Sequence, residues 1–134
     1  MITQYGVIPW REAEGGRRIL LITSRETRRW VVPRGNPMPG LEPWQAAAEE
    51  AWEEAGIRGD VASEPLGAYR YDKRRPDGSF LPAEVRLFAM KVREEAGTWP
   101  ESDERERRWF SPEEAAEAVD EPDLKALLIA VSDA

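Results

Sequence analysis

One segment constrains the fold more than any other: a run of helix-forming residues that ends at a glycine. Pro43 suits a first helical turn, residues 45–55 are mostly strong helix formers, and Gly56 supplies the stop. At 100° per residue, three carboxylates, Glu50, Glu53 and Glu54, share a face about 100° wide. The opposite face is apolar and carries Trp44, Ala48, Ala51, Trp52 and Ala55. Such a helix has to bury one face and leave its acidic face outside.

The segments around this helix are rich in β-forming residues. Gln4–Trp10 alternates, Arg18–Thr23 is an apolar run, and Trp30–Val32 is a short strand that Pro33 stops before an irregular loop to Gly40. Further strands are expected near 66–71, 84–92 and 106–110, and helices from Ser111 and Glu121. The pattern predicts one domain over 1–134, an α/β sandwich in which helices cover the faces of a mixed sheet.

The chain contains neither histidine nor cysteine. Imidazole bases, Ser-His-Asp triads, thiolate nucleophiles, disulfides and Cys-based zinc sites are therefore excluded. Any acid-base or metal chemistry has to come mainly from carboxylates, which with water favour hard cations such as Mg²⁺ or Mn²⁺.

Charge is unevenly distributed along the chain. The net charge of −7 argues against general nucleic-acid binding. Residues 42–54 hold five glutamates and no basic residue, whereas 70–75 hold four basic residues. This juxtaposition suits a metal bridging to an anionic ligand, although two ordinary solvated faces would give the same pattern. The apolar runs are too short to span a membrane, so a cytoplasmic protein without membrane contact is expected.

The segment from Gly35 to Ile57 resembles the Nudix box, G-x5-E-x7-R-E-U-x-E-E-x-G-U, where U is a bulky apolar residue. The matching positions are Gly35, Glu50, Glu53, Glu54, Gly56 and Ile57. The resemblance implies a Nudix-type α/β/α sandwich (an α+β fold) with a mixed sheet. It also implies Mg²⁺-dependent cleavage of a diphosphate linkage, with Mn²⁺ as a possible substitute. Glu50, Glu53 and Glu54 would then be the metal ligands and catalytic residues.

The lead-in Trp30–Gly35 also looks like that of the family, most of all the branch that handles diphosphoinositol polyphosphates and dinucleoside polyphosphates. The substrate expected from this resemblance is a small phosphoanhydride, either one of these compounds or another nucleoside diphosphate derivative. Arginine suits bidentate phosphate binding. The expected substrate-binding residues are Arg34, Gly35, Lys73, Arg74 and Arg75. A monomer or a homodimer is expected.

Two positions depart from the box: Leu41 replaces its first glutamate, and Glu49 replaces its arginine. Glu42 follows Leu41 directly and is a candidate substitute, while the sequence offers no substitute for the arginine. Three hypotheses are open: an active pyrophosphohydrolase, a weak or inactive nucleotide-binding module of the same fold, and a structural protein in which the acidic helix arose by chance. A general base from a distant loop is also expected, with four candidates: Glu84, Glu101, Glu104 and Glu106.

Overall fold

The computed structural model describes residues 1–132. The strands are β1 (Ile2–Ala13), β2 (Gly16–Thr23), β3 (Trp30–Val31), β4 (Arg34–Gly35), β5 (Ile57–Val61), β6 (Gly67–Arg74), β7 (Phe80–Glu95) and β8 (Arg107–Phe110). The helices are α1 (Pro43–Ala55), α2 (Pro112–Ala118) and α3 (Pro122–Val131). Among the residues described, no helix has both the length and the apolar character that crossing a membrane requires.

The strands form one mixed sheet with the order β3-β2-β1-β7-β5. Its central pair, β1 and β7, is parallel, whereas β2 and β5 join it in antiparallel fashion. Three further strands extend this path, because β4 pairs with β1, β6 with β7, and β8 with β2. The predicted mixed sheet is confirmed.

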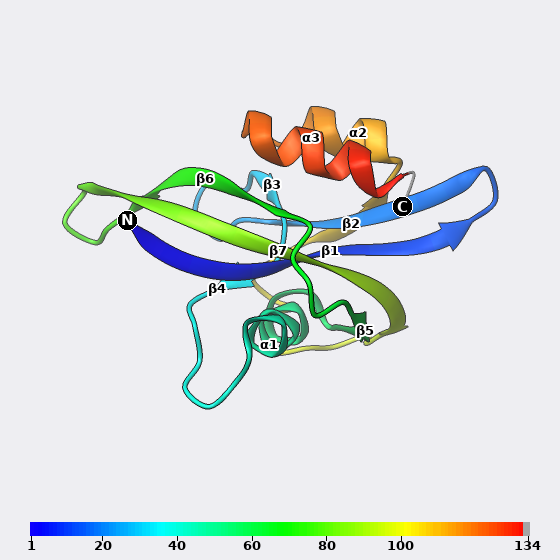
Figure 1. Ribbon diagram of the computed structural model, residues 1–134, viewed down its shortest axis with the longest axis horizontal. Helices are drawn as coiled ribbons and strands as arrows, with labels where there is room; N and C mark the ends of the chain where they lie inside the picture. Colours follow the sequence, from blue (N-terminus) through cyan, green and yellow to red (C-terminus); the bar gives the residue numbers. More distant parts are fainter. Residues whose placement is uncertain (133–134) are drawn as a thin grey trace.

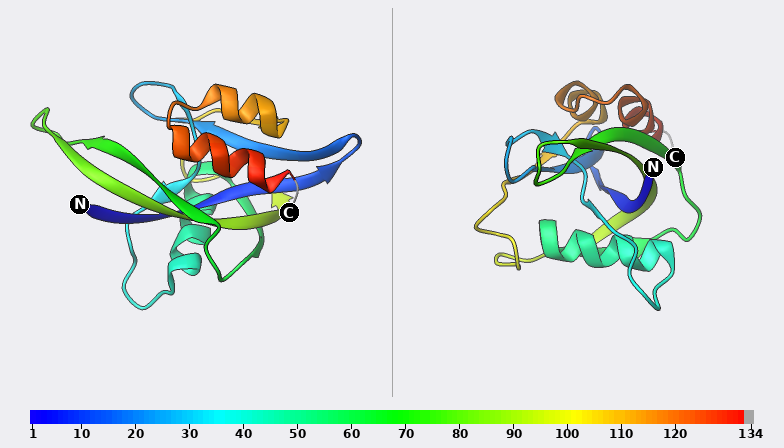
Figure 2. Two further views of the ribbon diagram at one scale, coloured as in Figure 1. Left: turned by 45° about the horizontal axis from the view of Figure 1, so that its top comes forward. Right: turned by 90° about the vertical axis from the view of Figure 1, so that its left-hand side faces the viewer.

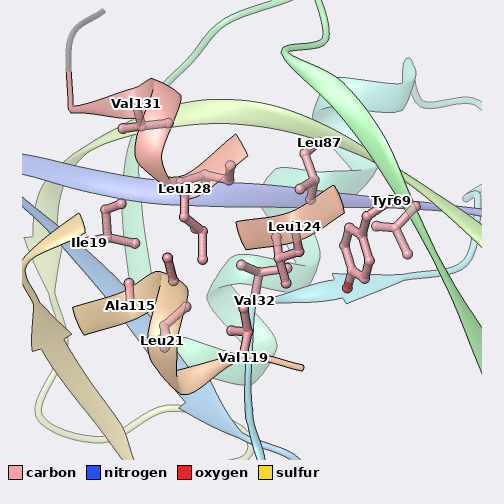
Figure 3. Packing of buried hydrophobic residues seen from close by; sticks show 13 residues of the cluster. Ile19, Leu21, Val32, Tyr69, Leu87, Ala115, Val119, Leu124, Leu128 and Val131 are labelled. Atoms are coloured by element: carbon pink, nitrogen blue, oxygen red, sulfur yellow. The ribbon is translucent and has the colours of Figure 1, made fainter. Parts of the chain in front are cut away.

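Helices cover both faces of the sheet, with α1 on one side and α2 and α3 on the other (Figure 1; Figure 2, right). A hydrophobic core lies on each face of the sheet, and β1 contributes to both because its successive side chains point to opposite faces. Val7 packs toward α1 and Ile8 toward the other helices. The core between the sheet and α3 is built on Leu124, Leu128 and Val131 (Figure 3). The predicted α/β/α sandwich is therefore confirmed.

Two strands were not expected from the sequence. Residues 57–61 bury only Ile57 and carry no apolar alternation, so β5 depends on its pairing with β7. The other, β4, lies within the proline- and glycine-rich segment that looked like an irregular loop, and it forms by pairing Tyr5 with Gly35 and Gly6 with Arg34.

The buried face of α1 lies closer to the carboxylates than the projection suggested, because Ala46, which projects beside Glu50, is only 1% exposed. Its centre is the stripe Ala47, Ala51 and Ala55, all fully buried. Trp44 and Trp52 lie at the margins and are only half-buried. Small side chains at the centre bring the helix close to the sheet, which places its acidic face beside the loop that follows β4.

Candidate active site

A cavity of about 430 Å³ lies where the acidic face of α1 meets β4, β6 and the loop 96–106 between β7 and β8. Its lining combines carboxylates and cations from parts of the chain far apart in sequence. The charged residues that matter most are Arg34, Glu50, Glu54, Lys73, Glu101 and Arg105. No tryptophan lines this cavity within residues 1–132.

Glu54 is held at both carboxylate oxygens. Its Oε1 accepts a hydrogen bond from the backbone N–H of Arg34 at 3.0 Å, which the pairing of β4 with β1 orients toward α1. Its Oε2 accepts one from Nη2 of Arg105 at 3.2 Å. Burial raises the pKa of Glu54 to about 7, although Arg105 and the Arg34 N–H act in the opposite direction.

Glu50 packs directly against Gly35. A Cβ atom on residue 35 would overlap the carboxyl group of Glu50, so any other residue at this position of the box would force the Glu50 side chain to move; the φ angle of Gly35 is not in the left-handed region. Burial raises the pKa of Glu50 to about 7, and the charges of Glu53 and Glu101 add to the effect. Glu50 thus lies among like charges in a partly dehydrated place.

Glu53 is placed differently from the other two glutamates. Its side chain is exposed and does not line the cavity, although its charge is near enough to raise the pKa of Glu50. Within residues 1–132, no three acidic side chains converge as a ready-made metal site. The structure therefore brings Glu50 and Glu54 to the cavity wall and leaves Glu53 at its rim.

This donor set nevertheless fits Mg²⁺. The ion is commonly bound by one or two carboxylates together with water and substrate phosphates, without a complete protein cage. Glu50 and Glu54 supply two such carboxylates, and burial penalises their negative charge when no cation is present. A divalent cation would remove that penalty.

Arg34 presents its guanidinium to the cavity from β4. The group stacks on the ring of Tyr71 with its Cζ 4.1 Å from the centroid, and its Nη1 donates to the hydroxyl of Tyr69 at 3.1 Å. Tyr71 in turn donates to Oε1 of Gln4 at 2.6 Å, and Nε2 of Gln4 donates to Oδ1 of Asn36 at 3.2 Å. The cation–π contact with Tyr71 and the two hydrogen bonds through Gln4 thus link Arg34 to the loop after Gly35.

The predicted basic cluster 73–75 is only partly brought to this cavity. Lys73 lines it. Arg74 lines two adjoining hollows of about 720 and about 550 Å³, and Arg75 lines only the smaller of these. The basic cluster therefore extends outward from the cavity along the β6–β7 hairpin.

The four candidate bases are separated by position. Glu101 lines the cavity, whereas Glu84 lies between Arg70 and Arg86 on the surface of the sheet. Glu104 pairs with Arg25 at 3.7 Å and Glu106 with Arg28 at 3.6 Å, and neither of these two glutamates lines the cavity. Of the four, Glu101 is the one in position to act on a substrate bound there.

Glu42, the candidate substitute for the missing acid, does not reach the cavity. It precedes the first turn of α1, where its backbone N–H donates to Oε1 of Gln45 at 2.9 Å, and it lines a separate hollow. Position 41, where the box has its first glutamate, holds an exposed leucine.

Sequence reasoning missed Gln4, Tyr69, Tyr71 and Arg105. The three residues of β1 and β6 read as ordinary strand positions. Arg105 lies 51 residues from Glu54 in a segment rich in alternating charges. Nothing in the local sequence distinguishes it from its neighbours Arg107 and Arg108.

In this architecture an acidic helix packs beside a glycine-containing loop and a mixed sheet. Comparison of the sequence with protein-family models identifies the class of protein that has it. The family model of the NUDIX domain matches residues 3–130. The chain belongs to the Nudix family, as its resemblance to the box predicted.

Individual relatives lie in the same family. Nudix hydrolase 16, mitochondrial, of Arabidopsis thaliana is 33% identical over 92% of this chain and 76% of its own length. Diphosphoinositol polyphosphate phosphohydrolase 3-alpha of Mus musculus is 32% identical over 75% of this chain, which spans only 58% of that relative. A solved structure of the C. elegans Ap4A hydrolase in a binary complex superposes with a TM-score of 0.72 at 22% identity, covering 99% of this chain and 96% of that one. The structural likeness confirms the fold. The Arabidopsis relative is named as mitochondrial, so the cytoplasmic location of this chain stays a prediction.

Proposed function

We propose that this chain is a Mg²⁺-dependent hydrolase, able to use Mn²⁺, that cleaves the diphosphate linkage of a small phosphoanhydride. The supporting observation is the cavity in which two partly buried carboxylates, Glu50 and Glu54, face the cations Arg34 and Lys73. Carboxylates that hold a divalent cation, next to cations that hold phosphate, are the arrangement that phosphoryl transfer needs.

Glu50 and Glu54, with Glu53 at the rim, would hold Mg²⁺, which supplies positive charge against the phosphate oxygens and lowers the pKa of water. Arg34 binds a phosphate through its planar fork, kept flat against Tyr71, and Lys73 adds a point charge on the same wall. These residues fix the substrate with its bridging oxygen over the carboxylates.

Glu101 is the proposed general base. It takes a proton from the attacking water, whose oxygen forms the new bond to phosphorus while the bond to the bridging oxygen breaks. The bridging oxygen leaves with the second phosphate and its electron pair. Glu101 is suited to this role because it lines the cavity from a loop and not from α1, on which the three box glutamates lie.

The substrate class rests on the relatives and on the basic hairpin. The mouse relative's name specifies diphosphoinositol polyphosphate, and the C. elegans structure is of an Ap4A hydrolase. Arg74 and Arg75 lie beyond Lys73 along the hairpin and would contact anionic groups that project out of the cavity. Candidate substrates are therefore diphosphoinositol polyphosphates, dinucleoside polyphosphates and nucleoside diphosphate derivatives.

The test is product formation from a panel of these compounds with Mg²⁺ or Mn²⁺, using the wild type and the variants Glu50→Gln, Glu53→Gln and Glu54→Gln. Loss of a precisely placed charged group should lower turnover at least about 100-fold in the variants at positions 50 and 54. Glu53→Gln tests whether the rim carboxylate also acts. Tight binding without product in the wild type would instead establish the nucleotide-binding module, the hypothesis motivated by Leu41 and Glu49.

A further inference from the structure

Arg105 uses all three edges of its guanidinium within the candidate site. Its Nε donates to Oε1 of Glu101 at 2.7 Å, and its Nη2 donates to Oε2 of Glu54 at 3.2 Å. Its Nη1 donates to the backbone carbonyl of Thr23 at 3.1 Å. The side chain is only 8% exposed, so these bonds form in a place where water competes poorly.

The acidic helix offers no cation of its own. Residues 42–54 contain no basic residue, and the last turn of α1 has none. Arg34 donates to Glu54 only through its backbone N–H, while its guanidinium donates to Tyr69 and stacks on Tyr71. Arg105 therefore provides the cation that is hydrogen-bonded to the carboxylates of the cavity in the described chain.

The backbone fixes Arg105 without help from Glu54. The next residue, Glu106, exchanges two bonds with Thr23, since its N–H donates to Oγ1 at 2.9 Å and its carbonyl accepts from the Thr23 N–H at 3.0 Å. Earlier in the same loop, the N–H of Glu101 donates to the carbonyl of Glu53 at 3.1 Å. These hydrogen bonds attach the loop to β2 and to the end of α1. The backbone of Arg105 is therefore held in place, and its guanidinium reaches the carboxylates from that position.

We propose that Arg105 is a positioning residue that holds Glu54 and Glu101 in the orientations required for cation binding and proton transfer. It bridges a carboxylate on the helix and one on the loop, so one side chain sets their mutual geometry. This assignment rests on the proposed function, and it gives the carboxylates a cation in a chain whose position 49, the arginine of the box, is a glutamate.

The experiment compares Arg105→Gln and Arg105→Lys with a matched control, Arg107→Gln. Arg107 comes from the same region and also secures α1, since its Nη1 donates to the carbonyl of Ala55 at 2.8 Å, but its guanidinium is not bonded to a carboxylate of the cavity. Binding of Mn²⁺ alone is followed by electron paramagnetic resonance, and melting temperatures are recorded for every variant. The values of kcat and KM are measured with the compound of the proposed panel that the wild type hydrolyses fastest.

For Arg105→Gln, a misplaced base should lower kcat by roughly 100-fold with KM changed less than about threefold. Loss of the orienting contact should weaken Mn²⁺ binding by roughly tenfold. Arg105→Lys should recover part of both losses because it keeps the charge but not the fork. Arg107→Gln should lower the melting temperature and leave the Mn²⁺ affinity unchanged.

The proposal is overturned if Arg105→Gln retains the wild-type kcat and Mn²⁺ affinity. It is equally overturned if Arg107→Gln, at a similar loss of melting temperature, reproduces the same defects, because the role would then be structural. Should Arg105→Gln fail to fold, the same criteria apply to Arg105→Lys. If the wild type neither binds Mn²⁺ nor forms product, the proposed function is overturned as well. If the wild type is active and the Arg105 variants behave like it, only the role of Arg105 is overturned.

Discussion

Gly35 and Glu50 are so close that the carboxylate of Glu50 can take its present position only because residue 35 has no Cβ atom. The carboxyl of Glu50 occupies the space in which any other residue at position 35 would place its Cβ atom. Glu50 is thereby confined between β4 and the like charges of Glu53 and Glu101. A position that looks like a loop glycine in the sequence is thus part of the candidate metal site.

Gly35→Ala should displace the Glu50 carboxyl and weaken Mn²⁺ binding by roughly tenfold, the size typical of a disturbed ligand support. Gly97→Ala is the control, because a Cβ there meets nothing within 4 Å. Titration of both variants with Mn²⁺ checks the expectation, and unchanged affinity in Gly35→Ala would show that Glu50 does not need its present place.

The raised pKa of Glu50 predicts how the metal-free protein responds to pH. A folded pKa of about 7 lies above the ordinary value of 4.5, so the folded state keeps a proton that the unfolded state releases. The associated stability is present below about pH 4.5 and is lost as the pH rises toward 7. Urea unfolding in a chelator should show Glu50→Gln gaining stability relative to wild type from pH 5 to pH 8. A constant difference across that range would contradict the shift.

At the level of elements, the carboxyl end of α1 is joined to the β7–β8 loop. The last carbonyls of the helix accept hydrogen bonds from that loop and from β8: Glu53 from the N–H of Glu101, Glu54 from Nε1 of Trp99, and Ala55 from Nη1 of Arg107. These bonds satisfy the backbone carbonyls that have no partner within the helix. They also hold the loop in a position where Glu101 and Arg105 reach the cavity.

Gly56, which ends α1, meets two constraints at once. Its φ of +67° is in the left-handed region, and a Cβ there would lie 2.7 Å from the Trp99 ring. Gly56→Ala should therefore cost about 2 to 3 kcal/mol in the free energy of unfolding. Gly40→Ala isolates the backbone part, about 1 kcal/mol, because Gly40 has a φ of +80° but open space around it. Equal losses in the two variants, measured by urea unfolding, would rule out a contribution from Trp99.

The elements that the sequence predicted are those with a strong local pattern. The residues of α1, the apolar strand within β2 and the Ser111 start of α2 all carry such a pattern, and all are confirmed. The strands β4 and β5 carry none, since their pairing partners impose their conformation. The same divide applies to the candidate site. The resemblance over 35–57 named Glu50 and Glu54, which line the cavity, and Glu53, which does not, whereas the position of Arg105 depends on how β2, α1 and the β7–β8 loop meet.

At the level of the whole molecule, four of the 19 basic residues in this chain of net charge −7 form one route, from Arg34 through Lys73 to Arg74 and Arg75. The acidic wall of the cavity faces the start of this route. A metal and an anionic substrate would therefore approach opposite sides of one cavity, and each would reduce the electrostatic cost of binding the other.

Mg²⁺ should stabilise the whole fold. A cation present at 100 times its Kd adds about 2.7 kcal/mol, which corresponds to a rise of roughly 10 °C in melting temperature for a domain of this size. The shift should vanish in Glu54→Gln and persist in Glu42→Gln, whose residue lies at the other end of α1 outside the cavity. Thermal melts with Mg²⁺ and with chelator give the comparison, and an equal shift in both variants would place the cation elsewhere.

The placement of the carboxylates at the end of α1 also bears on the lifetime of the protein. A helix has a partial negative charge at its carboxyl end, and here Glu53 and Glu54 lie in a last turn that contains no basic residue of its own, so that Arg105 from the β7–β8 loop offsets the repulsion only at Glu54. This unfavourable macrodipole interaction makes the cation-free protein the form that opens more readily. Proteolysis depends on the population of unfolded molecules. A shortage of divalent cations should therefore increase degradation of the chain as well as abolish its activity.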